Sequence, residues 1–299
     1  MTASSVRSAA MMGTVVSILV NRPADDACQQ TACDTAITEA LSWFAQVESV
    51  CSRFEPTSEL CALSRQIGSP MRVGELLFEV LHFALGVADR TGGAFDPTVG
   101  DTMIARGIAR NHRSARLVER ASSSDVAATF RDVVTVPDTR MVTLHRPLTL
   151  DLGAVAKGMA IDLAAKALCA LDSFAIDAGG DIFAGGQNAN NAPWVVGIRH
   201  PRRRGDMIAT VSVSNLAVCT SGTYERGEHL VHLRVGAARD TLASATVIAP
   251  SAMVADALAT AACVLGADEG LDLLVAEGVE GLLIRTDLTM VRTPAFPDA

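Results

Sequence analysis

Residues 253–265 read MVADALATAACVL, an alanine-rich run that predicts a helix. Asp256 and Thr260 are four residues apart within this run, so a carboxylate and a hydroxyl share one helical face. Oxygen ligands on one face suit a hard cation such as Mg²⁺, and further positions are left for backbone carbonyls, water and substrate phosphates. The same pair would also fit an ordinary helix face, so this spacing alone leaves both interpretations open.

A second segment, 151–158, reads DLGAVAKG and combines an acid, a glycine turn and the start of a predicted helix. The N-terminus of a helix attracts anions because its first backbone N–H groups have no partner within the helix. This segment could therefore hold a diphosphate, and an acidic protein that binds a polyphosphate needs a local cation to offset repulsion. Together the two segments predict a magnesium-dependent protein that acts on a dinucleotide.

The apolar periodicity of the chain predicts a mixed fold, with long helices among many short strands. No strict alternation of strand and helix is visible, which favours the α+β class over a doubly wound sheet. Helical patterns cover Ile37 to Cys51, Leu77 to Ala88, Gly153 to Leu168, Met253 to Leu265 and Gly270 to Ala276. Strand-like segments are Met12 to Val20, Val133 to Val136, Met141 to Leu144, Phe174 to Ile176, Trp194 to Ile198, Ile208 to Val213, His229 to Leu233, Ala245 to Ile248 and Gly281 to Ile284.

The composition allows a sizeable hydrophobic core, because 49% of the 299 residues are hydrophobic. The apolar stretch from Ala9 to Val20 is too short to cross a bilayer, so we expect a protein that is not integral to a membrane. Ser122 to Ser124 and Gly185 to Ala192 are predicted to be surface loops rather than linkers. The length of 299 residues allows one large domain or two small ones, and we expect one domain over residues 1–299.

Charge and cysteine content narrow the function classes further. The net charge of −8 at pH 7 disfavours nucleic acid as the main partner. The seven cysteines show neither CxxC pairs nor metal-type spacing, so we expect reduced thiols and a cytoplasmic location.

Several polar segments are ambiguous when each is taken alone. Residues 92–100, GGAFDPTVG, fit either a helix end followed by a turn or a loop whose N–H groups approach a nucleotide. Residues 177–181, DAGGD, allow the same interpretations after a predicted strand. Residues 219–224, CTSGTY, are interpreted as a polar turn. His229 and His232 share one face of a predicted strand, where a histidine is more often structural than catalytic.

The order of these segments and the residues in them resemble the motifs of the ApbE-like flavin transferases, enzymes that move FMN from FAD onto a threonine of a protein. The resemblance extends over almost the whole chain and implies an α+β fold related to the T-fold, with an antiparallel sheet and packed helices. The matching segments are Met12-Gly13-Thr14, Ser52-Arg53-Phe54 with Ser58-Glu59-Leu60, 92–97, 151–158, 177–181, 220–224 and 255–260.

The resemblance also implies roles for particular residues. A Mg²⁺ ion would be held by the carbonyl oxygen of Ala154 and by the side chains of Asp256 and Thr260. His229 would be the base for the acceptor hydroxyl, and Lys157, in the first turn of its predicted helix, would add positive charge beside the diphosphate. The residues implied to line the FAD site are Met12, Phe54, Ala94, Phe95, Asp96, Asp151, Lys157 and Val231.

The reaction implied by the resemblance is attack of a threonine hydroxyl on the FMN-side phosphorus of FAD, with release of AMP. FAD and an acceptor flavoprotein are therefore the implied partners. The family's Asp-Pro-x-Thr-Gly turn after the histidine is replaced here by residues 232–236, HLRVG. Two alternatives stay open, a magnesium-dependent FAD pyrophosphatase that uses water and an FAD-binding protein without turnover.

We expect Asp256 to lie exposed on its helix face, where its side chain contributes little to the stability of the fold. On this expectation, replacement of Asp256 by alanine harms catalysis more than folding.

Overall fold

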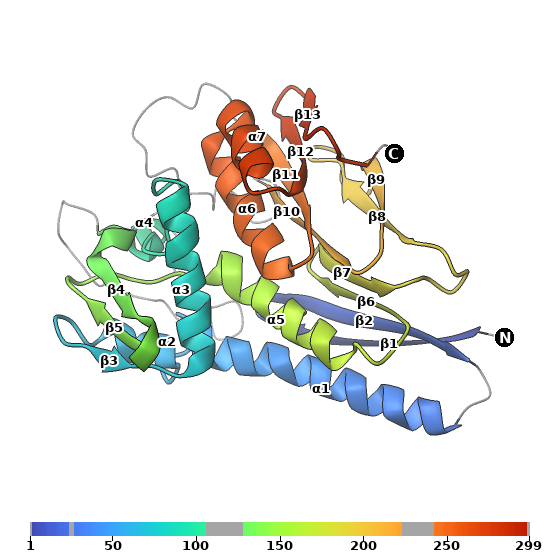
Figure 1. Cartoon of the computed structure of the whole chain (residues 1–299), viewed down its shortest axis with the longest axis horizontal. Helices are drawn as coiled ribbons and strands as arrows, with labels where there is room; N and C mark the ends of the chain where they lie inside the picture. Colours follow the sequence, from blue (N-terminus) through green and yellow to red (C-terminus); the bar gives the residue numbers. More distant parts are fainter. Residues whose placement is uncertain (1, 24–26, 106–127, 223–241, 298–299) are drawn as a thin grey trace.

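The computed structural model describes residues 2–23, 27–105, 128–222 and 242–297, drawn in colour in Figure 1. Its centre is an eight-stranded sheet in the order β1-β2-β6-β7-β10-β11-β12-β13, and every neighbouring pair is antiparallel. The strands are β1 (Thr2–Met11), β2 (Thr14–Pro23), β6 (Ser173–Ala178), β7 (Asp181–Gly186), β10 (Leu216–Gly222), β11 (Leu242–Ala249), β12 (Glu280–Arg285) and β13 (Met290–Arg292).

Helices pack in series on one face of this sheet, as Figure 1 shows. Helix α5 contacts both α1 and α6, and α6 in turn contacts α7 and the strands β10 and β11. The helices α1, α3, α5 and α6 share one hydrophobic core with the inner face of the sheet. The bounds are α1 (Ala27–Cys51), α3 (Glu75–Arg90), α5 (Gly153–Ala167), α6 (Ala252–Leu265) and α7 (Ala267–Ala276).

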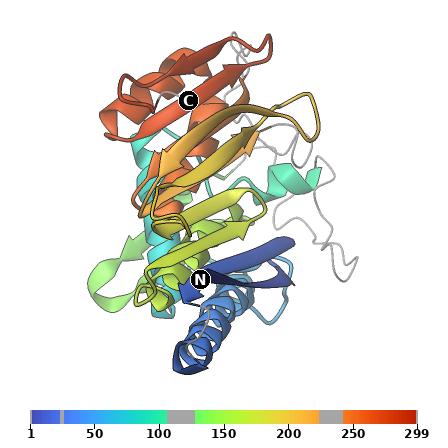
Figure 2. The same cartoon turned by 90° about the vertical axis from the view of Figure 1, so that its right-hand side faces the viewer.

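Part of the opposite face of the sheet, at β7, β10, β11 and β12, is covered by a two-stranded ribbon, seen from the side in Figure 2. Its strands are β8 (Trp194–Arg199) and β9 (Met207–Val213), and it encloses a second, smaller core that includes Ile248 of β11. Val247, the neighbour of Ile248, belongs instead to the helix-side core, as expected for side chains that alternate across a strand. Every residue of β11 is buried because this strand is covered on both faces.

A smaller sheet packs beside α3, in the order β3-β5-β4. It is connected to short helices that lead toward α5 (Figure 1). The bounds of these elements are α2 (Glu59–Ser64), β3 (Met71–Arg72), α4 (Gly100–Ala105), β4 (Val133–Val136) and β5 (Met141–Leu144), with single 3₁₀ turns at Phe130–Asp132 and Pro137–Thr139.

The structure confirms the α+β class and all five predicted helices, although α1 begins earlier than its apolar pattern, at Ala27. The sequence prediction missed β1, because this edge strand is rich in serine and alanine and its valine, Val6, is 65% exposed. It also placed 219–222 in a turn, whereas these residues lie within β10. The sequence prediction missed β7 as well, and its loop from Gly185 begins too early because β7 extends to Gly186. The predicted strand at His229 to Leu233 and the loop at Ser122 to Ser124 lie outside the described residues.

Met12 and Gly13 form a two-residue turn between β1 and β2, so the predicted strand from Met12 begins instead at Thr14. Both turn residues have positive φ, 49° and 73°, which matches the mirror-image turns that suit the twist of a hairpin. Gly179 and Gly180 form the corresponding turn between β6 and β7, with φ of 73° and 104°. The two turns lie against each other, since a Cβ atom on Gly179 would be 2.3 Å from the Thr14 hydroxyl.

Gly179→Ala is expected to lower the free energy of unfolding by about 1–3 kcal/mol more than Gly68→Ala. Both glycines have nearly the same φ, +73° and +74°, but an added Cβ meets Thr14 at Gly179 and nothing within 4 Å at Gly68. A comparison of the two variants by urea unfolding isolates the contribution of the packing between the turns. Equal losses of unfolding free energy would show that the close approach of the turns does not contribute to stability.

Candidate functional site

Helices α5 and α6 meet at a point where no side chain separates them. A Cβ atom on Gly158 would lie 2.4 Å from Cα of Met253 and 2.6 Å from the carbonyl oxygen of Ala252. The Asp162 carboxylate fixes the same contact, because it accepts hydrogen bonds from the Ser251 hydroxyl (2.6 Å) and the backbone N–H of Ala252 (2.7 Å) and Met253 (3.0 Å). The start of α6 is therefore held against the middle of α5.

This crossing brings the two segments singled out in the sequence into direct contact. Lys157 of α5 donates from Nζ to Asp256 Oδ2 of α6 at 2.7 Å, and it also donates to Asp181 Oδ2 at the start of β7. The ammonium thus lies between carboxylates from two different elements. Ala154 is three residues before Lys157, so it shares the same face of α5.

Asp256 is buried, with 4% of its surface exposed, and the expectation of an exposed helix-face aspartate is wrong. The sequence pattern could not reveal this, because the alanines around Asp256 pack on all sides of α6 and α5 crosses over its first turns. A buried carboxylate needs hydrogen bonds or an opposite charge, and Lys157 supplies both to Asp256. Asp256 therefore contributes to the packing of α5 against α6.

Strand β10 positions the remaining polar groups of this cluster. The backbone N–H of Thr220 donates to Asp181 Oδ1 at 2.9 Å, and the next residue, Ser221, lies with its hydroxyl 3.0 Å from that of Thr260. Asp256 and Thr260 do share one face of α6, as their spacing predicted. The sequence analysis included Ser221 and Asp181 only as members of the segments 220–224 and 177–181. Their contacts with α5 and α6 could not be predicted from the spacing of residues along the chain.

The N-terminus of α5 is fixed by Asp151. Its Oδ1 accepts from the backbone N–H of Gly153 at 2.9 Å, and its Oδ2 accepts from Nε of Arg53 at 2.6 Å. The Arg53 guanidinium also lies 4.2 Å from the ring centroid of Phe54, within the range of a cation–π contact. Sequence analysis gave Arg53 no role, because its partner Asp151 lies 98 residues further along the chain. Lys157 is the fifth residue of α5, so it begins the second turn and not the first turn where it was predicted.

The segment 92–100 forms the predicted turn after α3 and then a compact loop. Asp96 organises this loop, because its carboxylate accepts from the N–H (2.8 Å) and the hydroxyl (2.7 Å) of Thr98 and from the N–H of Phe130 (3.0 Å). Burial raises the pKa of Asp96 above its usual value. Ala94 and Phe95 are buried beside it, and the carbonyl oxygen of Pro97 accepts from the N–H of Asp151 at 2.7 Å. The loop is thereby tied to the start of α5.

The structure leaves part of the predicted site undefined. His229, Val231 and the turn at 232–236 lie outside the described residues. Met12 is half-buried in the turn between β1 and β2, beside the Gly179–Gly180 turn. The described part of the chain holds no group of three or more His, Cys, Asp or Glu side chains arranged to bind a metal ion. Within the same residues, no helix combines the length and apolar character that crossing a membrane requires.

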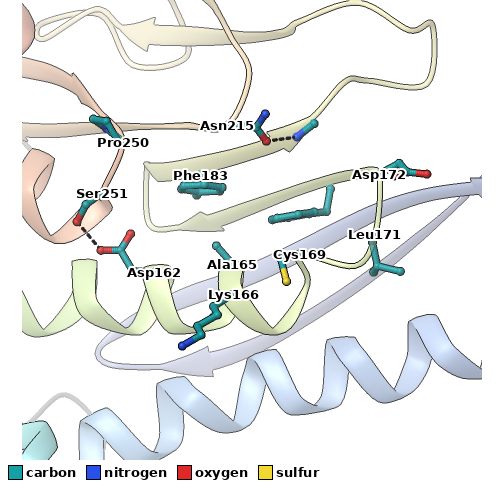
Figure 3. A pocket seen from close by; sticks show the side chains of 12 residues that line it. Asp162, Ala165, Lys166, Cys169, Leu171, Asp172, Phe183, Asn215, Pro250 and Ser251 are labelled. Carbon is teal, nitrogen blue, oxygen red and sulfur yellow. Dashed lines mark hydrogen bonds between the residues drawn. The ribbon is translucent and has the colours of Figure 1, made fainter.

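A cavity of about 590 Å³ lies along the C-terminal half of α5 (Figure 3), and Lys157 is not among the residues that line it. The stacked rings of Phe174 and Phe183 form one wall, and Lys166 near the end of α5 and Cys169 in the turn that follows border it. None of the residues predicted for the site lines this cavity. The predicted chemistry is instead at the N-terminal half of α5.

Known proteins similar to this chain share one family. The model of the ApbE family matches residues 12–283. The FAD:protein FMN transferase of Treponema pallidum is 33% identical over 94% of this chain and 84% of that protein, and the one of Haemophilus influenzae is 29% identical over 81% and 76%. The crystal structure of the ApbE protein of Thermotoga maritima has a TM-score of 0.81 at 25% identity and covers 98% of this chain and 97% of that one. The flavin transferase ApbE of Vibrio cholerae has the same fold, with a TM-score of 0.81 at 22% identity over 99% of both chains.

Gly158→Ala is expected to reduce the free energy of unfolding by about 1–3 kcal/mol or more, because the new methyl group meets backbone atoms of α6 that cannot move freely. Gly86→Ala in α3 is the matched control, since its added Cβ meets only the end of the Arg90 side chain at 3.4 Å. The control should gain up to about 1 kcal/mol of helix stability. Chemical unfolding measures both, and stabilisation by Gly158→Ala would contradict the close crossing of α5 and α6.

The pH dependence of stability should report the burial of Asp162. Burial raises the pKa of this carboxyl group, so the folded protein holds the proton more tightly than the unfolded chain does. Its contribution is fully present below the unfolded pKa of about 4 and is lost as the pH rises through the folded value. Relative to Asp162→Asn, which cannot ionise, the wild type should lose stability from pH 4 upward in urea unfolding series. A wild type that gains stability relative to the variant over this range would contradict the assignment.

Proposed function

Because the chain belongs to the ApbE family, we propose that it is an FAD:protein FMN transferase, which moves FMN from FAD to an acceptor protein. The name shared by its relatives supports this activity. The observation that carries the proposal is the contact between Lys157 and Asp256, because it joins the segment predicted to hold a diphosphate to the segment predicted to hold a cation.

FAD is proposed to bind as the substrate, with its diphosphate near the N-terminal half of α5. Two observations support this placement. The positive end of the α5 helix dipole favours an anion, and Lys157 adds a positive charge at the start of the second turn. The loop 92–100 and Asp151 are joined through Pro97, which places the other proposed contacts beside the same helix end. The proposed FAD contacts are Met12, Phe54, Ala94, Phe95, Asp96, Asp151, Lys157 and Val231.

The donor groups on α5 and α6 fit a magnesium ion. The Asp256 carboxylate, the Thr260 hydroxyl and the Ala154 carbonyl would hold it, and all three are oxygen donors of the kind that Mg²⁺ prefers. Asp256 already has an ammonium group at 2.7 Å, so its surroundings accommodate a positive charge. When bound, the metal would neutralise charge on the diphosphate and on the leaving group.

The chain's own residues would position FAD and move one proton. We propose that a threonine hydroxyl of the acceptor forms a bond to the FMN-side phosphorus while the phosphoanhydride bond to AMP breaks. AMP leaves with the electron pair of that bond, and the hydroxyl proton passes to His229, the proposed base. Lys157 would keep a positive charge beside the diphosphate throughout. The cytoplasmic location remains a prediction from the cysteine content.

The purified protein, incubated with FAD and Mg²⁺ with or without a candidate flavoprotein acceptor, separates the proposed activity from its alternatives. Release of AMP only in the presence of the acceptor, with an FMN mass increase on an acceptor threonine, is the expected result. AMP release that needs no acceptor would make the protein an FAD pyrophosphatase. Binding of FAD without any AMP would make it a non-catalytic flavin-binding protein.

Asp256→Asn is expected to lower magnesium-dependent AMP release by about 100-fold or more, because it removes the only charge among the proposed metal donors. The variant should stay folded with a loss of about 1–3 kcal/mol, because Lys157 keeps its pairing with Asp181. Asp268→Asn on α7, whose side chain is 88% exposed, is the control and should behave as wild type. Chromatography of AMP and thermal unfolding measure the two effects; wild-type turnover in Asp256→Asn refutes the metal assignment.

A further inference from the structure

The Lys157 ammonium has two carboxylate partners that differ in how they are held. Asp181 is fixed from both oxygens, since Oδ1 accepts from the backbone N–H of Thr220 and Oδ2 accepts from Lys157. Asp256 lies on α6 on the same face as Thr260, one of the proposed metal donors. All three charged side chains are largely buried, with exposures of 12% for Lys157 and 6% for each aspartate.

A divalent cation that binds Asp256 must compete with the ammonium for the same carboxylate. Two cations close to one buried carboxylate repel each other strongly, because water screens them poorly there. An ammonium that lost its only partner would either leave the site or prevent the metal from binding. Asp181 removes this conflict, because it offers Lys157 a second carboxylate that is anchored to the sheet and not to α6.

The chemistry of residue 157 supports a specific role for this arrangement. The sequence contains only two lysines, Lys157 and Lys166, and the other 23 of its 25 basic residues are arginines. An ammonium is a compact point charge with three rotatable donors that can shift between two carboxylates, whereas the donors of a guanidinium point in directions fixed by its planar fork. The buried position whose side chain contacts both Asp181 and Asp256 is thus filled by the less common base.

We propose that Asp181 is a positioning residue, which retains the Lys157 ammonium beside the diphosphate when a divalent cation takes Asp256. This inference rests on the proposed function, because it assumes that Asp256 binds the metal. Asp181 acts here through Lys157 and does not itself touch the metal or FAD. Without Asp181, Lys157 would pair with Asp256 alone and would be released whenever the cation binds.

Amine labelling tests this directly, because the chain has only two lysine side chains to follow by mass spectrometry. The full-length protein is treated with a small acylating reagent, with EDTA or with saturating MgCl₂, in the absence of FAD. Exposed Lys166 is the internal reference. Asp181→Asn retains an oxygen for the Thr220 N–H, and Asp177→Asn, which changes a nearby acid that accepts from Gly180 instead, is the matched control.

In the wild type and in Asp177→Asn, Mg²⁺ should leave the labelling rate of Lys157 unchanged, because Asp181 still holds the ammonium. In Asp181→Asn, Mg²⁺ should raise the rate roughly tenfold, as expected for the loss of one charge-assisted hydrogen bond, while the rate at Lys166 stays constant. An increase with Mg²⁺ in the wild type would overturn the proposal, because it would show that the metal displaces Lys157 from Asp181 as well. An Asp181→Asn variant that responds to Mg²⁺ as the wild type does would also overturn it.

The outcome of the labelling experiment does not depend on whether the protein transfers FMN. Labelling needs neither FAD nor an acceptor, so a failure of FMN transfer leaves the experiment unchanged. Thermal unfolding of each variant with and without MgCl₂ reports metal binding independently. A variant that merely unfolds would expose Lys157 equally with EDTA and with MgCl₂, and that outcome would count against a positioning role.

Discussion

A buried ion pair between two helices holds the proposed site together. Lys157 on α5 reaches Asp256 on α6 because Gly158, the next residue of α5, lets the backbones of the two helices touch. A side chain at 158 would push the helices apart and separate Lys157 from the buried Asp256 carboxylate, and breaking a buried ion pair is far more costly than the loss of one surface pair. Asp162 reinforces this crossing one turn further along α5, at the first N–H groups of α6.

The sheet supplies the fixed frame against which this helix pair is placed. Asp181 begins β7, directly after the Gly179–Gly180 turn, and Thr220 and Ser221 belong to β10, the next strand in the sheet. Asp181 contacts Lys157 of α5, and Ser221 contacts Thr260 of α6. Thr220 holds Asp181 through its backbone N–H. The polar cluster therefore joins both layers of the fold, and its geometry depends on the register of the strands as well as on the helix crossing.

Much of this arrangement follows from the sequence, and the part that does not has a physical cause. The helical periodicity of 253–265 correctly placed Asp256 and Thr260 on one face, because i and i+4 positions are fixed by helix geometry alone. The burial of Asp256 and its pairing with Lys157 depend on which helix crosses α6, and no local pattern contains that information. The partners Arg53 and Asp181 were missed for the same reason, since each lies far along the chain from the residue that it holds. The edge strand β1 was missed because its serines and alanines carry little apolar alternation, and its pairing with β2 supplies the missing stability.

The central claim is that Asp256 and Thr260 hold a divalent cation against the diphosphate of FAD. A crystal structure of the protein with MnCl₂ and FAD, measured with the anomalous scattering of manganese, tests it most directly. The account predicts an anomalous peak within coordination distance of the Asp256 carboxylate and the Thr260 hydroxyl, next to the FAD phosphates. A manganese peak bound elsewhere, with both side chains remote from the phosphates, would contradict it.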